Sequence, residues 1–196
     1  GLHSGDSACV LPPQRITPAQ QDVMRAHSVA FARALGVVGL MNVQYAIKDD
    51  TVYVIEVNPR ASRTVPYLAK ATGLPLAQIA ARVMAGRSLA SLGVVEDLTP
   101  TGVFVKSPVF PFVRFPGVDT ILGPEMKSTG EVMGGAGSFG MAFMKAMLGV
   151  GQRLPESGTV CLSVNNDDKP EVLPIARELA AMGFSIAGTR GTAAFL

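Results

Sequence analysis

The strongest chemical feature of the sequence is a carboxylate and an amide that alternate along a short apolar stretch. Glu56 and Asn58 lie in the stretch VIEVNPR at positions 54–60. Side chains of a β-strand alternate between its two faces, so an extended conformation places Glu56 and Asn58 on the same face. Carboxylate and amide oxygens suit Mg²⁺, and the guanidinium of Arg60 is suited to phosphate oxygens. The stretch therefore predicts a site for a divalent cation beside a phosphate group.

Gln44 is a third candidate ligand, provided that it faces Glu56. Residues 38–48 and 51–58 are expected to form two strands of a hairpin. A two-residue turn would put Gln44 and Glu56 on opposite faces, whereas a three-residue loop would put them side by side. The metal hypothesis therefore predicts the three-residue loop. This loop, from Asp49 to Thr51, pairs Gln44 with Glu56 and Asn42 with Asn58.

A simpler interpretation is that Glu56 and Asn58 only occupy the solvent side of an antiparallel sheet. Two features favour the functional interpretation. The strand is otherwise strongly apolar, and the sequence NPRASR places Arg60 and Arg63 three positions apart just beyond it.

The remaining segments up to about residue 150 are expected to hold this hairpin in place. Thr17 is a good N-cap, with Pro18 in the first turn and Gln20 completing a capping box. Gly36 is a natural end for this helix. Residues 1–15 and most of 87–130 are expected to be loops. Further elements are expected as short helices at 65–72 and 76–84, a strand at 103–107 and a helix at 139–148.

A change in composition at 149–158 predicts a linker between two domains. After it come an apolar strand at 159–164, a helix at 169–182 and a strand from 184. A strand, a helix and a strand in succession indicate a parallel α/β unit. The sequence thus favours an α+β domain over residues 1–150 and an incomplete Rossmann-like α/β domain over 151–196.

The composition excludes several classes of protein. The chain has 196 residues, 48% of them hydrophobic and 16% charged, which suits a folded core. The net charge is only +2, the basic residues are scattered and there is no Trp, so we expect no nucleic-acid surface. No segment is apolar and long enough to cross a membrane. Cys9 and Cys161 lie far apart, which fits a reducing cytosol rather than a disulfide framework.

The glycine-rich sequence GAGSFG at 135–140 matches the dinucleotide fingerprint G-x-G-x-x-G. We interpret it as a packing or flexible loop, because no convincing strand leads into it and no βαβ unit surrounds it.

Three long segments resemble the large subunit of carbamoyl-phosphate synthetase. They are GLHSGDSACVLPP at the start, IEVNPRASRTVPYLAKATG in the middle and FPGVDTILGPEMKSTGEVMG further on. The third is the most specific, since other ATP-grasp ligases share only the Glu-x-Asn pattern. The resemblance runs from residue 1 to about 194, and implies the carboxy lobe of the second ATP-grasp domain.

The resemblance implies roles for particular residues. Mg²⁺ or Mn²⁺ would be held by Gln44, Glu56 and Asn58. The residues implied to contact ATP are Gly1, Leu2, His3, Ser4, Gln44 and Glu56. Arg60 and Arg63 would hold the phosphoryl acceptor and the transferred group. For Arg63, one turn past Arg60, the alternative is a structural salt-bridge partner.

The tail resembles the start of a methylglyoxal-synthase-like allosteric domain, which follows the second ATP-grasp half. The residues implied to bind phosphorylated nucleotide effectors are Ser163, Lys169, Thr189 and Thr192. Asp6 matches a carboxylate that holds ornithine in enterobacterial-type enzymes. The second carboxylate of that site is replaced by Ser107, so we expect a weak response to ornithine.

The family resemblance implies a cytoplasmic ligase that phosphorylates carbamate. Its parent reaction makes carbamoyl phosphate from bicarbonate, glutamine-derived ammonia and two ATP, for arginine and pyrimidine synthesis. A small glutaminase subunit would be its partner, and the full-length enzyme would be oligomeric. The isolated chain is expected to be inactive, because an ATP-grasp holds the nucleotide between two lobes. The alternatives are another ATP-grasp ligase and a non-catalytic effector-binding module.

Overall fold

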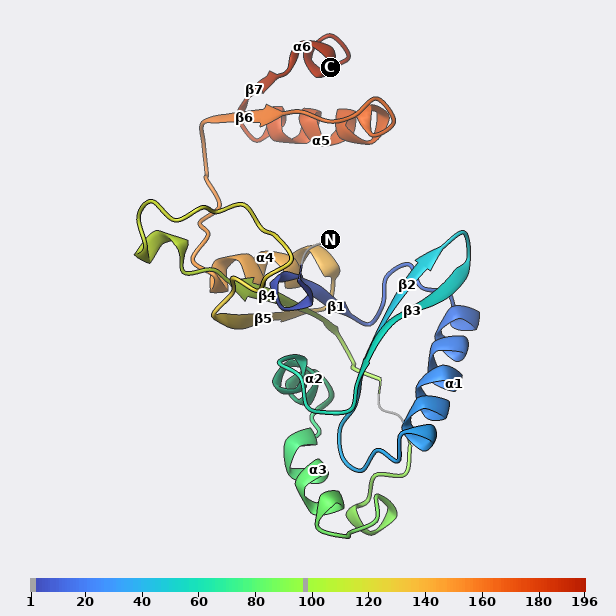
Figure 1. The fold of residues 1–196 in the computed structure, drawn as a ribbon. Helices are drawn as coiled ribbons and strands as arrows, with labels where there is room; N and C mark the ends of the chain where they lie inside the picture. The colour runs from blue at the N-terminus through green and yellow to red at the C-terminus, as the bar shows by residue number, and fades with distance from the viewer. Residues whose placement is uncertain (1–2, 97–98) are drawn as a thin grey trace. The chain divides into compact units, whose positions relative to one another are not determined.

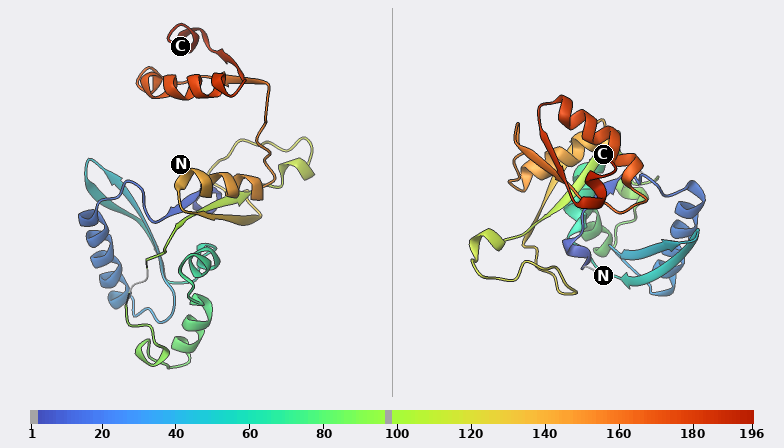
Figure 2. Two further views of the ribbon diagram at one scale, coloured as in Figure 1. Left: turned by 180° about the vertical axis from the view of Figure 1, so that it is seen from behind. Right: turned by 90° about the horizontal axis from the view of Figure 1, so that it is seen from above.

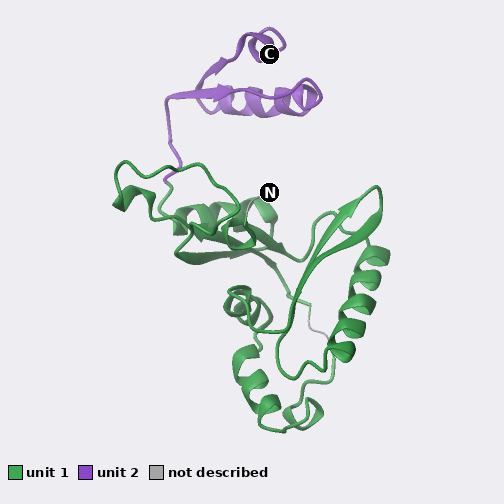
Figure 3. Cartoon of the chain, viewed as in Figure 1, with its two compact units in different colours: residues 1–152 green, residues 153–196 purple. Residues whose placement is uncertain are grey.

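The computed structural model describes residues 3–96 and 99–196. The chain divides into two compact units, Gly1–Gln152 and Arg153–Leu196 (Figure 3). The division falls inside the segment 149–158, where the composition of the sequence changes. Within the described residues, no helix is long and apolar enough to cross a membrane.

An antiparallel sheet with a helix on one face forms the best-packed part of the first unit (Figure 1). The strands are β1 (Cys9–Leu11), β4 (Val103–Val109) and β5 (Gly130–Ala136), in the order β1-β4-β5. Helix α4 (Phe139–Gly149) packs Ala142 and Ala146 against Val105, and all three side chains are buried. Gly134 permits this close approach, because a Cβ there would overlap the backbone of α4.

Two of these strands were not expected from the sequence. Strand β1 lies in the segment 1–15, for which a loop was predicted, so that prediction is wrong for Cys9–Leu11. Strand β5 leads directly into the GAGSFG sequence, so the expectation that no strand precedes it is also wrong. Because β5 pairs with β4 in antiparallel fashion, the glycines still do not belong to a βαβ unit.

A hairpin and a long helix form the second part of this unit. Strands β2 (Asn42–Lys48) and β3 (Thr51–Asn58) pair in antiparallel fashion, and α1 (Pro18–Ala34) lies alongside them (Figures 1 and 2). The predicted capping box is confirmed, with Thr17 and Gln20 bonding to each other's backbone N–H. The Tyr45 hydroxyl joins the two elements, since it lies 3.0 Å from the Met24 carbonyl and donates to it.

The hairpin reaches the predicted pairing by an unpredicted route. The loop is a two-residue turn in which Asp49 and Asp50 have φ of 49° and 61°, so the three-residue loop is wrong. A β-bulge then shifts the register beside Gln44, and within the described strands the pairing passes over Ile55. The extra residue places Gln44 opposite Glu56, as predicted. Asn42 likewise pairs with Asn58.

Two short helices follow the hairpin, and the first is fixed to the sheet. Helix α2 (Thr64–Thr72) is joined to α3 (Leu76–Met84) through Gly73. The buried Tyr67 of α2 donates a hydrogen bond of 2.8 Å to the carbonyl of Phe104 in β4. Burial, with a smaller effect from Cys9, raises the pKa of Tyr67 to about 12. The start of α2, where Arg63 lies, is thereby tied to the sheet.

Among the described residues of the first unit there are also three single-turn 3-10 helices. They are Ser4–Asp6, Ala90–Leu92 and Phe112–Arg114.

The second unit is a parallel strand pair with one crossover helix, as the sequence predicts. Strands β6 (Thr159–Leu162) and β7 (Ser185–Gly188) are parallel neighbours, and α5 (Lys169–Ala181) connects them. A short helix, α6 (Arg190–Ala193), follows β7 and buries Thr192.

The capping box provides a test of how α1 is stabilised. Replacing Thr17 by Ala leaves the N–H of Gln20 without its side-chain acceptor, and should lower the free energy of unfolding by about 1 kcal/mol. Chemical denaturation followed by circular dichroism measures this change. Thr17→Ser, which keeps the acceptor oxygen, should lose much less. Equal losses in the two variants would show that the methyl group, rather than the cap, matters.

Candidate functional site

A cavity of about 560 Å³ in the first unit gathers most of the predicted site residues. Its walls come from the 3-10 helix at the start, the β2–β3 hairpin, the segment before α2, and strands β4 and β5. The predicted residues that line it are His3, Ser4, Gln44, Glu56, Asn58, Arg60 and Arg63. Gly1 and Leu2 lie outside the described residues.

Glu56 is the point at which the two predicted amide ligands meet. Its Oε1 accepts hydrogen bonds from Gln44 Nε2 at 2.6 Å and from Asn58 Nδ2 at 2.8 Å. Gln44 lies directly across the hairpin from Glu56, and Asn58 is two residues further along the same strand face. Two amide side chains, one from each strand, thus converge on one carboxylate oxygen.

The chemistry of these three side chains fits a hard divalent cation. A carboxylate and two amides offer only oxygen ligands, as Mg²⁺ prefers. The present hydrogen bonds point two amide N–H groups at Glu56, and half a turn of either amide replaces its nitrogen with its oxygen. In the part of the chain that the structure describes, no group of three or more His, Cys, Asp or Glu side chains is placed to hold a metal ion. A cation here would therefore depend on Glu56 and the two amides.

Arg60 lies beside Asn58 in the cavity wall. Its Nη2 is 3.4 Å from Asn58 Oδ1, and its Nη1 donates to the carbonyl of Ala61 at 3.0 Å. The side chain is exposed, so it remains accessible to a ligand in the cavity.

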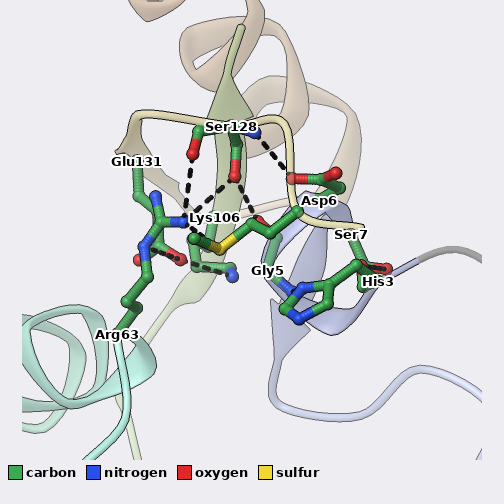
Figure 4. Close-up of polar contacts among 9 residues, drawn as sticks. His3, Gly5, Asp6, Ser7, Arg63, Lys106, Ser128 and Glu131 are labelled. Carbon is green, nitrogen blue, oxygen red and sulfur yellow. Dashed lines mark hydrogen bonds and ion pairs between the residues drawn. The ribbon is translucent and has the colours of Figure 1, made fainter. Parts of the chain in front are cut away.

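Arg63 contacts a different wall of the cavity. Its Nη1 lies 2.8 Å from Met126 Sδ and 3.1 Å from Ser128 Oγ, and its Nε is 3.9 Å from Glu131 Oε1 (Figure 4). Among the described residues, its Nη2 has no hydrogen-bond partner. Arg63 thus has structural partners and also lines the cavity.

His3 and Ser4 form the amino-terminal edge of the cavity. His3 caps the first 3-10 helix, because its Nδ1 accepts a hydrogen bond of 3.0 Å from the N–H of Gly5. With Nδ1 used as an acceptor, the neutral imidazole carries its proton on Nε2.

A buried ion pair in the cavity wall was not predicted from the sequence. Lys106 of β4 is 1% exposed, and its Nζ lies 2.9 Å from Glu131 Oε1 of β5. A lysine inside the apolar stretch VFVKSPV was the available signal, since a charge on a central strand is expected to have a partner. Its partner could not be identified because β5 was not predicted.

Asp6 is buried and bonded to the chain's own backbone. Its Oδ1 accepts from the N–H of Ser128 and its Oδ2 from the N–H of Lys127, each at 2.8 Å. Desolvation raises the pKa of this carboxyl, but hydrogen bonds from Ser128 and Lys127, with the nearby His3, outweigh it and lower the pKa. Ser107, at the position of the expected second carboxylate, is also buried.

In the second unit, the predicted effector residues lie together after the carboxyl ends of the parallel strands. The Ser163 and Thr189 hydroxyls are 3.4 Å apart, and Thr189 donates to Thr192 Oγ1 at 3.3 Å. Thr192 Oγ1 also accepts from the N–H of Val164. Lys169 points the same way, since a Cβ built on Gly191 would lie 3.6 Å from its Nζ.

Comparison with known proteins shows to which family the chain belongs. Residues 1–92 match the family described as "Carbamoyl-phosphate synthase L chain, ATP binding domain". The carbamoyl phosphate synthase large chain of Pasteurella multocida is 58% identical over 196 residues, which are 100% of this chain and 18% of that protein. The large chain of Neisseria meningitidis serogroup A is 57% identical over the same coverage. The chain belongs to the carbamoyl phosphate synthase large-chain family. It spans 18% of the length of these relatives.

Solved structures with low sequence identity show the same ATP-grasp fold. A single-chain, multi-domain long-chain acyl-CoA carboxylase matches 72% of this chain and 18% of its own, with a TM-score of 0.56 at 18% identity. The N5-carboxyaminoimidazole ribonucleotide synthetase of Thermus thermophilus matches 76% of this chain and 43% of its own, with a TM-score of 0.54 at 13% identity. These proteins outside the large-chain family share the fold of this chain, and the similarity shows nothing about their chemistry.

The buried carboxylate of Asp6 predicts a pH-dependent anchor for residues 127–128. A carboxyl whose pKa is lowered on folding stabilises the fold above its unfolded pKa, near 3.9, and this contribution is lost as the pH falls through the folded value. Asp6→Asn replaces one acceptor oxygen by an NH2 group, which cannot accept a hydrogen bond. The amides of Lys127 and Ser128 should therefore exchange about tenfold faster at pH 7. Hydrogen exchange with mass spectrometry measures this in the full-length protein. Equal protection in the two proteins at pH 7 would contradict the anchor.

Proposed function

We propose that the cavity is one wall of an ATP site at which carbamate is phosphorylated to carbamoyl phosphate. The observation that carries the proposal is the convergence of Gln44 and Asn58 on Glu56, with two arginines lining the same cavity. Family membership supplies the reaction class, because the relatives are carbamoyl phosphate synthase large chains. Alternatives such as another ATP-grasp ligase or an effector-binding module alone are not favoured.

In this proposal the chain's own residues position charge around the transferred phosphoryl group. Glu56, Gln44 and Asn58 hold Mg²⁺ or Mn²⁺, which neutralises charge on the ATP phosphates. Arg60 and Arg63 approach the acceptor and the transferred group from two sides of the cavity. Phosphoryl transfer depends on positioning and charge neutralisation more than on a nucleophilic side chain, which suits this set of residues.

The opening segment is proposed to contact the nucleotide. His3 and Ser4 line the same cavity as Glu56 and its two amide partners. With His3 Nδ1 bonded to Gly5, the Nε2–H is the group available to donate to a ligand oxygen. Gly1 and Leu2 are assigned to the same contact by the family resemblance alone.

The full-length protein is proposed to carry out the whole reaction of its family. It would combine bicarbonate, ammonia from a glutamine-hydrolysing small subunit, and two ATP, in the cytoplasm, for arginine and pyrimidine synthesis. Residues 1–150 belong to the second ATP-grasp domain in this assignment, and 151–196 begin the allosteric domain. The proximity of Ser163, Thr189 and Thr192 supports a phosphate-binding role for that second segment. The full-length enzyme is proposed to be oligomeric.

Glu56→Gln in the full-length protein tests the proposal. The variant keeps the shape of the side chain but removes the charge that would bind the cation, so carbamate phosphorylation should fall at least about a hundredfold. The assay is the reverse reaction, in which ADP and carbamoyl phosphate give ATP and carbamate. Glutamine hydrolysis by the small subunit should remain measurable.

Asp49→Asn is the matched control for this variant. It makes the same carboxylate-to-amide change on the same hairpin, but at the turn and outside the cavity. Its reverse reaction should keep the wild-type rate. A wild-type rate in Glu56→Gln, or an equal loss in both variants, would overturn the proposed role of the carboxylate.

A further inference from the structure

Ser128 lies between Arg63 and the 3-10 helix Ser4–Asp6 (Figure 4). Its Oγ donates to the carbonyl of Gly5 at 2.9 Å and accepts from Arg63 Nη1 at 3.1 Å. A hydroxyl has a single hydrogen, so donation to Gly5 leaves only the lone pairs of Ser128 to face the guanidinium. The carbonyl oxygen of Ser128 is a second acceptor for the same nitrogen, at 3.4 Å.

The backbone of Ser128 is itself fixed from the opposite side. Both oxygens of Asp6 accept from backbone N–H groups, one of Lys127 and one of Ser128. Asp6 and Ser128 are 5% and 4% exposed, so water cannot readily replace these bonds. The hydroxyl of Ser128 is therefore a rigid reference point rather than a mobile surface group.

All the partners of the Arg63 side chain, among the residues that the structure describes, come from one segment. Met126, Ser128 and Glu131 supply them. Glu131 is already paired with the buried Lys106 at 2.9 Å, a full ångström closer than its 3.9 Å approach to Arg63. The hydroxyl of Ser128 is the better placed oxygen for the guanidinium.

We propose that Ser128 is a positioning residue that sets the orientation of Arg63 over the cavity. Its oxygens hold Nη1, while Nη2 has no hydrogen-bond partner among the described residues. This inference rests on the proposed function, in which Arg63 contacts the transferred group or its acceptor. It adds to that function a residue that does not line the cavity and acts on the ligand through Arg63.

The experiment measures the reverse reaction of the full-length enzyme. In this reaction the bond from phosphorus to the carbamate oxygen breaks and a bond to the β-phosphate oxygen of ADP forms. Ser128→Ala should lower kcat/KM for carbamoyl phosphate about tenfold, because the guanidinium loses an acceptor that fixes its orientation. The KM for ADP should stay unchanged, since Ser128 does not line the cavity. Ser128→Cys, a weaker acceptor of similar shape, should have a kcat/KM between those of the wild type and Ser128→Ala.

A double-mutant cycle separates positioning from general damage to the fold. If Ser128 acts through Arg63, then adding Ser128→Ala to Arg63→Ala should change kcat/KM less than about twofold. Thr72→Ala is the control, because it also removes a hydroxyl. The Thr72 hydroxyl bonds to the backbone of Leu68 and Leu74, at the opposite end of α2 from Arg63. This control should keep the wild-type rate.

The remaining outcomes contradict the inference in distinguishable ways. A full tenfold loss from Ser128→Ala in the Arg63→Ala background, or a raised KM for ADP, would show a structural role only. Wild-type kinetics in Ser128→Ala alongside a strong loss in Arg63→Ala would refute the positioning role and leave the proposed function intact. Wild-type kinetics in Arg63→Ala would contradict the proposed role of Arg63 and the inference that depends on it.

Discussion

The site depends on one register, in which Gln44 faces Glu56 across a hairpin. A one-residue slip would move every side chain of one strand to the other face of the pair and separate the two. The tight turn at Asp49-Asp50 creates that slip, and the bulge at Ile55 cancels it. A local irregularity of the backbone is therefore what brings the amide of Gln44 to the carboxylate of Glu56, whereas Asn58 lies on the same strand face as Glu56 in any register.

The opposite wall of the cavity is held in place by buried charged side chains, whereas the hairpin wall depends on strand register. Lys106 and Glu131 lie diagonally across adjacent strands, with 2% and 14% of their side chains exposed. Removing one partner of such a pair typically costs about 3–5 kcal/mol, because the remaining charge stays buried. Asp6 acts differently, since its charge is compensated by backbone N–H groups. Together these groups hold residues 126–131 in place, and this segment in turn holds Arg63.

The sequence predicted the elements whose patterns are local. Helix α1 could be placed from Thr17, Pro18 and Gln20, because the capping box involves only neighbouring residues. The convergence at Glu56 was predicted from strand alternation, although the reason given for the register was wrong. The turn type depended on two aspartates adopting left-handed conformations, which propensity alone does not determine.

The sequence could not predict contacts that depend on strand β5. Its sequence, GEVMGGA, has three glycines, which weaken the strand signal. The glycine at 134 is needed for the packing of α4, so a global requirement overrides local preference there. Without β5, neither the partner of Lys106 nor the contacts of Ser128 with Asp6 and Arg63 could be inferred.

The central claim is that Glu56 and its two amides hold a divalent cation together with ATP. Electron paramagnetic resonance of Mn²⁺, titrated into the full-length protein with a non-hydrolysable ATP analogue, tests it most directly. The account predicts that Glu56→Gln binds fewer Mn²⁺ ions per protein than the wild type, because the cation loses its only carboxylate ligand in this cluster. Equal numbers of ions with equal affinities in the two proteins would contradict the account.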